Sequence, residues 1–142
     1  MAASVTIGAV QPGLPLVDYH LETLEEAVAA AQTTLDGVVA AVDRAGRAGC
    51  AAVALTEDTL GVHKWLAAHP GQSRQALDVL VPRLLARLGA VAAAHRLHVV
   101  CASDAGVGES VYSTAFLIGP DGDLVGQYRK VNLPYSELGT RC

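Results

Sequence analysis

Apolar residues recur along this chain with two different periods, and the longer period predicts two helices. From about Glu22 to Ala48, Leu, Val and Ala return every three or four positions, as they do on one face of an amphipathic helix. Gly37 weakens the middle of this pattern, and Asp36 could cap a second helix there. "RAGRAG" closes the pattern with glycines that suit a helix end. The sequence therefore predicts a first long helix that ends before residue 50.

A second helical pattern covers residues 72–96, with Ser73 as a possible N-cap. Pro82 would kink this helix or lie near a turn start, because proline lacks the backbone N–H of a helix interior. The segment before it, residues 58–71, is predicted to be a loop that could include one helical turn.

Short runs rich in β-branched residues predict five strands. They cover residues 4–11, 50–57, 97–103, 110–119 and 123–130. The run 50–57 is continuous and apolar, as in a strand that is buried on both faces. "PDG" separates the last two runs and indicates a hairpin, whereas "DAGVGE" before them is predicted to be a loop.

The predicted order is β-α-β-α-β-β-β, which places the chain in the α/β class. The first part favours parallel strands covered by helices, and the closing hairpin makes the sheet mixed. A generic doubly wound domain, such as a flavodoxin-like binder, is one alternative for this order.

Composition narrows the possible partners. The chain has 142 residues, a hydrophobic content of 51% and a net charge of −4, which suits one folded domain. It has no cluster of Lys or Arg, so a nucleic-acid partner is not expected. No apolar run approaches the length of a spanning helix and no basic leader precedes an apolar one, so we expect no membrane association and a cytoplasmic location.

Two charged residues follow predicted strands and could form a site. Glu57 comes directly after "AAVAL", and ligands of α/β sheets bind outside the carboxyl ends of strands. A half-buried carboxylate there could act as a general base. Lys130 ends the last strand and could stabilise an oxyanion, whereas Arg129 should face solvent on the other side of the strand. The structural alternatives are a solvated acid at a loop and a charge that guards a sheet edge.

Cysteine and histidine patterns predict no metal site. Cys50 and Cys101 lie at or inside apolar strands, where buried structural cysteine is the common case. "HRLH" around His95 and His98 is too short to indicate a metal, and "GVG" lacks the context of a phosphate-binding loop. We therefore expect no metal and no cofactor.

Three segments in order resemble the nitrilase superfamily, also called carbon-nitrogen hydrolases. "SVTIGAVQP" is similar to the first strand of that family. "LDGVVAAVDRAGRAGCAAVALTED" resembles its helix, turn and second strand running into a catalytic glutamate, and "VYSTAFLIGPDGDLVGQYRKVNLP" resembles its hairpin and catalytic lysine. Two positions depart from the family pattern, because Thr56 stands where proline is common and Ser113 where asparagine is common.

The resemblance implies a mechanism with a Glu-Lys-Cys triad. Glu57 would be the base, Lys130 would stabilise the tetrahedral intermediate, and Glu137 would support the lysine. In the family the nucleophilic cysteine lies well beyond the lysine, so it is not carried over to Cys142, and no nucleophile is expected in this chain. The implied substrates are small amides, nitriles or carbamoyl compounds.

The resemblance also implies that residues 1–142 form a single, incomplete domain, half of a nitrilase-like α-β-β-α sandwich. Such a half should expose a sheet edge and an apolar sheet face, and should be inactive alone. The full-length protein is expected to be a homo-oligomer. The alternative function is a non-catalytic binding or assembly module of the same fold that needs a partner chain.

Overall fold

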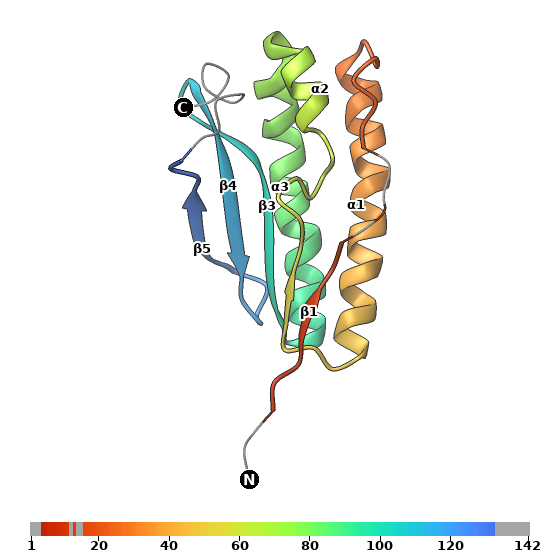
Figure 1. Ribbon diagram of the computed structural model, residues 1–142, viewed down its shortest axis with the longest axis vertical. Coiled ribbons are helices and arrows are strands. Elements are labelled where there is room, and N and C mark those ends of the chain that lie inside the picture. The colour runs from red at the N-terminus through yellow and green to blue at the C-terminus, as the bar shows by residue number, and fades with distance from the viewer. Residues whose placement is uncertain (1–3, 12, 14–15, 133–142) are drawn as a thin grey trace.

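The computed structural model describes residues 4–11, 13 and 16–132 of the chain, which form a mixed five-stranded sheet with three helices (Figure 1). The strands are β1 (Ile7–Ala9), β2 (Ala52–Ala54), β3 (His98–Val107), β4 (Ser110–Ile118) and β5 (Leu124–Arg129). The helices are α1 (Leu24–Arg47), α2 (His63–Ala68) and α3 (Pro70–His95). The α/β class and the mixed sheet agree with the sequence prediction.

Strand order explains why the carboxyl ends of several strands meet at one end of the molecule. The order is β1-β2-β3-β4-β5, with parallel pairs up to β3 and antiparallel pairs after it. Because β5 is antiparallel to β4 and β4 is antiparallel to β3, β5 again runs in the direction of β3. β1, β2, β3 and β5 therefore all end at the same side of the sheet.

The structure contains the two predicted long helices and one further short helix. This short helix lies in residues 58–71, where the sequence predicted a loop that could include one helical turn. α3 begins at Pro70, so the capping residue is His69 and not Ser73. Ser73 lies inside the first turns of α3, where its hydroxyl donates to the carbonyl oxygens of Leu66 and His69. Pro82 lies within α3 without ending it.

The predicted loop "DAGVGE" is instead mostly strand. Residues 104–107 of β3 continue to pair with β4, and Val107 faces Ser110 across a two-residue turn. Gly108 in that turn has φ +59°, a conformation that glycine adopts without steric cost. Glycine and acidic residues are uncommon in strands, so the composition of this segment indicated a loop, whereas pairing with the neighbouring strand stabilises it as a strand.

The helix α1 is continuous through Asp36 and Gly37, so no second helix begins there. Its start is fixed by a capping box, in which the Thr23 hydroxyl accepts from Glu26 N–H at 3.2 Å and the Glu26 carboxylate accepts from Thr23 N–H at 3.2 Å. Near its end, α1 approaches α3 so closely that a Cβ on Gly46 would lie 2.3 Å from His95 Cγ. Glycine at this position therefore permits the packing of the two long helices.

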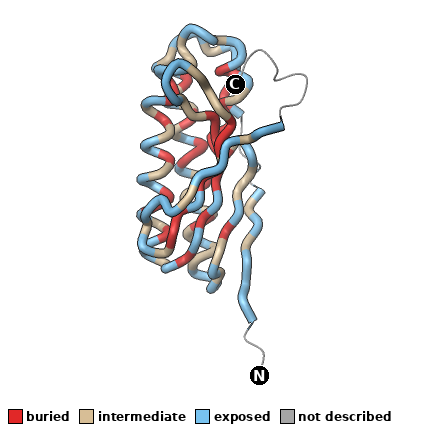
Figure 2. Tube along the Cα trace, turned by 90° about the vertical axis from the view of Figure 1, so that its left-hand side faces the viewer, coloured by how far each residue is buried: buried red, intermediate tan, exposed pale blue. Residues whose placement is uncertain are grey.

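The core lies between one face of the sheet and the helices α1 and α3 (Figure 2). Alternation along β3 turns Val99 and Cys101 into this core and Val100 to the other face. Burial of large aliphatic side chains from both long helices supplies the main stabilising term. The fully buried side chains of these helices include Leu35, Val38, Val42, Leu77, Leu80, Leu84 and Leu88.

The other face of the sheet, here called the open face, exposes apolar side chains. The cross-strand register places Ile7, Val100, Leu117 and Tyr128 on it, and their exposed fractions reach 69% at Ile7 and 64% at Tyr128. The sequence prediction of an exposed apolar face thus holds for the described residues. None of the three helices in this part of the chain combines the length and apolarity that crossing a membrane requires.

Candidate active site

Glu57 and Lys130 meet at the end of the sheet where β2 and β5 both finish. Lys130 Nζ donates to Glu57 Oε1 at 2.8 Å. Glu57 follows β2 and Lys130 follows β5, so three strand spacings, about 14 Å, separate the two chain segments. The two long side chains cross this distance over β3 and β4, and the predicted meeting of carboxylate and ammonium is confirmed.

The loop that carries Glu57 is held to the sheet by Thr59. Thr59 N–H donates to the Ala102 carbonyl at 2.9 Å, and Ala102 N–H donates to the Thr59 hydroxyl at 3.1 Å. The same hydroxyl donates to the carbonyl of Thr56 at 3.0 Å. These bonds continue the β2–β3 pairing beyond the last residue of β2, so Glu57 lies in a well-fixed loop.

Lys130 is placed by its backbone. Its N–H donates to the Ser113 carbonyl at 2.8 Å, which extends the β4–β5 ladder by one residue and directs the side chain to the open face. Arg129 projects to the opposite face, where its guanidinium lies 4.8 Å from the centre of the Tyr112 ring. The two neighbouring cations therefore point to opposite faces of the sheet, and Arg129 is exposed to solvent as expected, whereas the role of Lys130 stays a prediction.

Glu57 and Lys130 differ in how far their side chains are exposed to solvent. The Glu57 side chain is 67% exposed, whereas the Lys130 side chain is 30% exposed. The half-buried carboxylate envisaged from the sequence is thus more open to water than expected. In water an ion pair of this kind contributes little to stability, so the contact is more informative about chemistry than about folding.

A second pair of side chains, which sequence reasoning missed, lies beside the first. His63 Nδ1 is 3.5 Å from Asp104 Oδ2, and Asp104 faces Ser113 across the β3–β4 register. His63 begins α2, and Asp104 belongs to the segment predicted as a loop. Alternation of side chains along a strand could have identified Asp104 from the sequence. If the strand predicted at 97–103 is continued by one residue, Asp104 lies on the same face as Val100.

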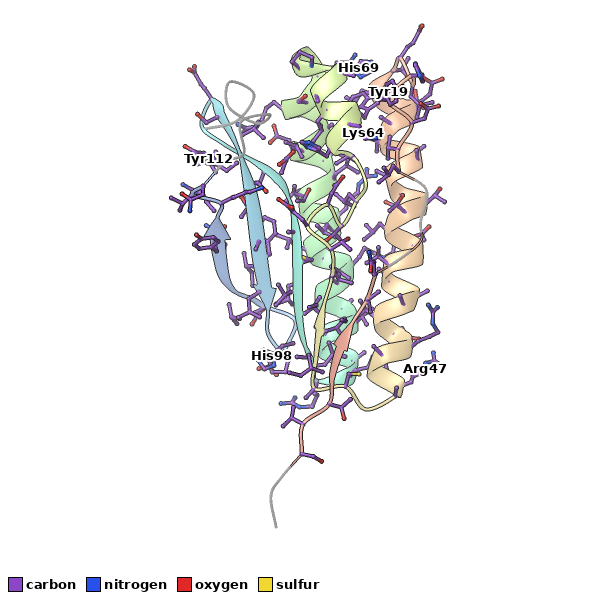
Figure 3. The ribbon with its side chains drawn as sticks, viewed as in Figure 1. Tyr19, Arg47, Lys64, His69, His98 and Tyr112 are labelled. Atoms are coloured by element: carbon purple, nitrogen blue, oxygen red, sulfur yellow. The ribbon has the colours of Figure 1, made fainter. Side chains whose placement is uncertain are left out.

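Glu57 and the His63–Asp104 pair border a hollow of about 180 Å³. Among the described residues it is lined by Leu16, Glu57, Asp58, His63, Lys64, Asp104 and Ser113. The wall combines carbon stems with carboxylate, ammonium and imidazole groups, so it suits a small molecule with both polar and apolar parts. Lys64 and Tyr112 lie toward this end of the molecule, and His98 lies toward the opposite end (Figure 3).

Neither cysteine in the described residues faces this hollow. Cys101 is fully buried in the core on the helix side of β3, and burial raises the pKa of its thiol to about 12. Cys50 precedes β2 and is therefore at the amino end of that strand. A buried thiol with a raised pKa is a poor nucleophile, so the structural interpretation of Cys101 holds.

Other candidates from the sequence lie elsewhere. Glu137 and Cys142 fall outside the described residues, so the supporting role of Glu137 stays a prediction. His95 Nε2 contacts Asp43 Oδ1 at 2.8 Å between the last turns of α1 and α3, the helices that cover the other face of the sheet (Figure 1). Within residues 4–11, 13 and 16–132, no group of three or more His, Cys, Asp or Glu side chains is arranged to hold a metal ion.

Comparison with known proteins gives a consistent family and fold. The sequence model of the family described as carbon-nitrogen hydrolase matches residues 6–141. No curated protein matches the chain by sequence.

Among solved structures, the NitN amidase from Nesterenkonia sp. AN1 is similar with a TM-score of 0.69 and 22% identity, over 92% of this chain and 46% of that chain. A mutant of the Nesterenkonia sp. AN1 amidase in complex with butyramide is similar with a TM-score of 0.72 and 21% identity, over 96% of this chain and 47% of that chain. The likeness shows a nitrilase-like fold, and this chain spans about half the length of these amidases.

Proposed function

Because the chain belongs to the carbon-nitrogen hydrolase family, we propose that its Glu57–Lys130 pair serves the hydrolysis of a non-peptide C–N bond in a small amide, nitrile or carbamoyl compound. The observation that carries this proposal is the 2.8 Å contact between Lys130 Nζ and Glu57 Oε1. It brings a carboxylate and an ammonium from distant segments to the end of the sheet where ligands of α/β proteins commonly bind, which supports the proposal.

In the proposed reaction of an amide, Glu57 accepts the proton of a cysteine thiol. The thiolate attacks the carbonyl carbon, and Lys130 stabilises the negative oxygen of the tetrahedral intermediate. The C–N bond breaks as the leaving nitrogen takes the proton from Glu57, which releases ammonia and leaves a thioester. Glu57 then takes a proton from water, the hydroxide attacks the thioester, and the acid and free thiol are released.

The nucleophile in this proposal comes from outside the described residues, since Cys50 and Cys101 do not face the hollow. The Glu57 side chain is exposed to water, whereas a fixed cation stabilises a developing negative charge best where water is excluded. This exposure therefore supports a further covering of the pair in the active protein. Further polypeptide over the open face would exclude water from the pair. The homo-oligomer and the cytoplasmic location expected from the sequence remain part of this proposal.

The decisive experiment is an assay of ammonia release from short aliphatic amides by the longest natural chain that contains this sequence. Glu57→Gln should lower kcat by about 10²- to 10⁴-fold, the usual range for loss of a general base. Glu25→Gln, which changes an exposed glutamate in the first turn of α1, is the matched control and should leave turnover unchanged. Full activity in Glu57→Gln would refute the proposal.

The open face favours a second candidate function, an assembly module that binds a partner chain without turnover. Its exposed apolar residues Ile7, Val100, Leu117 and Tyr128 resemble the composition of surfaces that other polypeptides cover. In that case Leu117→Lys in β4 should abolish association in sedimentation measurements, while Val125→Lys, at an exposed apolar position of β5, should not. Association that is unaffected by Leu117→Lys would argue against this function.

A further inference from the structure

Lysine is rare in this chain, and both lysines belong to the end of the sheet where Glu57 lies. The 142 residues contain two lysines, Lys64 and Lys130, beside eight arginines. Lys130 Nζ contacts Glu57, whereas Lys64, on α2, lines the hollow next to Glu57 (Figure 3). A general need for surface charge does not explain this placement, because arginine occupies all the other Lys or Arg positions of the chain.

Helix stability does not explain Lys64 either. Lys64 is the second residue of α2, and the first turn of this helix has no acidic side chain. A cation near the amino end of a helix is unfavourable, because the backbone dipole is positive there. The side chain is exposed, and no ion pair joins it to another residue within the part of the chain that the structure describes. Lys64 therefore brings to the wall of the hollow an ammonium group that no carboxylate in this part of the chain neutralises.

The three carboxylates that line the hollow, in contrast, each have a partner. Glu57 Oε1 accepts from Lys130 Nζ at 2.8 Å. The Asp58 carboxylate accepts from two backbone N–H groups, at 3.0 Å and 3.2 Å. Asp104 Oδ2 lies 3.5 Å from His63 Nδ1. A negatively charged ligand would therefore meet carboxylates whose charge is already engaged by protein groups.

We propose that Lys64 determines substrate specificity by binding a carboxylate group on the acyl chain of the amide. This inference rests on the proposed function and names its substrate class, the monoamides of short dicarboxylic acids. The amide end of the substrate lies at Glu57 and Lys130, and the carboxylate at its other end lies at Lys64. Lys64 takes no part in the proton transfers, so it selects the substrate and does not act on the reacting atoms.

The size of the hollow limits the length of such a substrate. Its volume of about 180 Å³ is below the range of about 300–1,000 Å³ found for drug-sized ligands. Glu57 and Lys64 both line this small space, so only a few carbon atoms can separate the amide from the carboxylate. Succinamate, the monoamide of a four-carbon diacid, meets this requirement. Butyramide is the matched neutral amide, because a methyl group replaces the carboxylate.

Discrimination between these two amides follows from the charge on Lys64. The carboxylate of succinamate gains an ion pair with the ammonium, whereas the methyl group of butyramide gains none. Because Lys64 is exposed, the preference should be about fivefold, the upper end of the range for an exposed ion pair. Dissolved salt screens exposed charges, so it should weaken the binding of succinamate and leave that of butyramide unchanged.

The test measures kcat/KM for succinamate and butyramide with the longest natural chain that contains this sequence. Succinamate should be preferred about fivefold at low salt, and the preference should fall as sodium chloride is added. NMR of the same chain, with lysine labelled at the ε-carbon, follows binding whether or not either amide is hydrolysed. Succinamate should shift the Lys64 signal, which is identified by its absence in Lys64→Arg, and butyramide should shift it less.

Three variants separate recognition of the carboxylate from a structural role. Lys64→Met keeps most of the length of the side chain but not its charge, and should reduce the preference for succinamate to less than about twofold. Lys64→Arg keeps the charge and should retain most of the preference. Arg83→Met, which removes an exposed cation from α3, is the matched control for net charge and should retain all of it. The kcat/KM for butyramide in each variant corrects for general damage to the hollow.

Equal kcat/KM for the two amides in the natural chain would overturn the proposal, as would a preference for succinamate that survives in Lys64→Met. Equal losses of kcat/KM for both amides in Lys64→Met would assign this side chain a structural role and would also overturn it. Failure of the proposed function has a different result, because neither amide then releases ammonia. In that case the NMR titration still decides whether Lys64 binds succinamate.

Discussion

Lys130 Nζ lies 2.8 Å from Glu57 Oε1, although the two residues are 73 positions apart in the chain and belong to segments separated by two intervening strands. The contact depends on β5 running in the same direction as β2, so that both chains reach the same end of the sheet. A fold with β5 reversed would place Lys130 at the opposite end. The pair is therefore a consequence of topology as much as of side-chain chemistry.

Lys130→Ala should lower kcat for amide hydrolysis by about 10²- to 10³-fold in the longest natural chain, the range for loss of one oxyanion-stabilising group. The free energy of unfolding should change by less than about 1 kcal/mol, because exposed ion pairs contribute little. Arg129→Ala is the matched control, since it removes the adjacent cation from the other face. Equal activity in the two variants would contradict a catalytic role for Lys130.

Asp58 should stabilise the start of α2 through its two carboxylate oxygens. They accept from Val62 N–H at 3.2 Å and His63 N–H at 3.0 Å. Asp58→Ala should lower the free energy of unfolding by about 1–2 kcal/mol, as loss of a helix cap does, and Asp58→Asn by less because one acceptor oxygen remains. Urea denaturation measures both changes.

The control for Asp58 is Asp78→Ala, which removes a carboxylate from an exposed ion pair within α3. That change should lower the free energy of unfolding by about 0.5 kcal/mol or less. Equal effects of Asp58→Ala and Asp78→Ala would show that Asp58 does not fix the first turn of α2.

Thr59→Val should destabilise the loop that carries Glu57. The side chain is nearly isosteric, but it leaves the Ala102 N–H and the Thr56 carbonyl without their hydroxyl partner. Loss of these buried hydrogen bonds should lower the free energy of unfolding by about 1–3 kcal/mol. Thr33→Val on the exposed side of α1 should change it by less than about 0.5 kcal/mol, and a similar effect at the two sites would disprove the anchoring role.

Cys101 should make the protein less stable at alkaline pH. Its folded pKa is raised to about 12 from 9.0 by burial, so above about pH 9 the thiol ionises in the unfolded state before it does in the folded state. The contribution of the Cys101 thiol to the free energy of unfolding is therefore fully present below the pKa of the unfolded state. It falls as the pH rises toward 12, by up to about 1.4 kcal/mol per pH unit.

The measurement is urea denaturation from pH 8 to pH 11 for the natural chain and for Cys101→Ala. Cys101→Ala leaves a cavity that lowers the free energy of unfolding by the same amount at every pH. The informative quantity is therefore the slope of the free energy of unfolding against pH, which should be smaller in the variant. Parallel slopes would show that the Cys101 thiol does not titrate differently on unfolding.

The sequence by itself determined the class of fold and the identity of the proposed catalytic pair. Period-3.6 and β-branched patterns predicted both long helices and the five strands, because burial of one face imposes a regular spacing on apolar residues. Glu57 and Lys130 stood out because charged residues directly follow apolar strands. The resemblance to carbon-nitrogen hydrolases, carried by three motifs, agrees with the family match over residues 6–141.

Only the tertiary structure decided how these residues are arranged around the hollow. Asp104 begins the segment "DAGVGE", whose glycines indicated a loop, whereas in the structure pairing with β4, which places Ser113 opposite Asp104, makes residues 104–107 part of a strand. The sequence predicted a loop at His63. In the structure, hydrogen bonds to the Asp58 carboxylate fix the turn that begins α2 at this residue. Local propensity could not reveal either residue, because their positions depend on contacts between segments far apart in the chain.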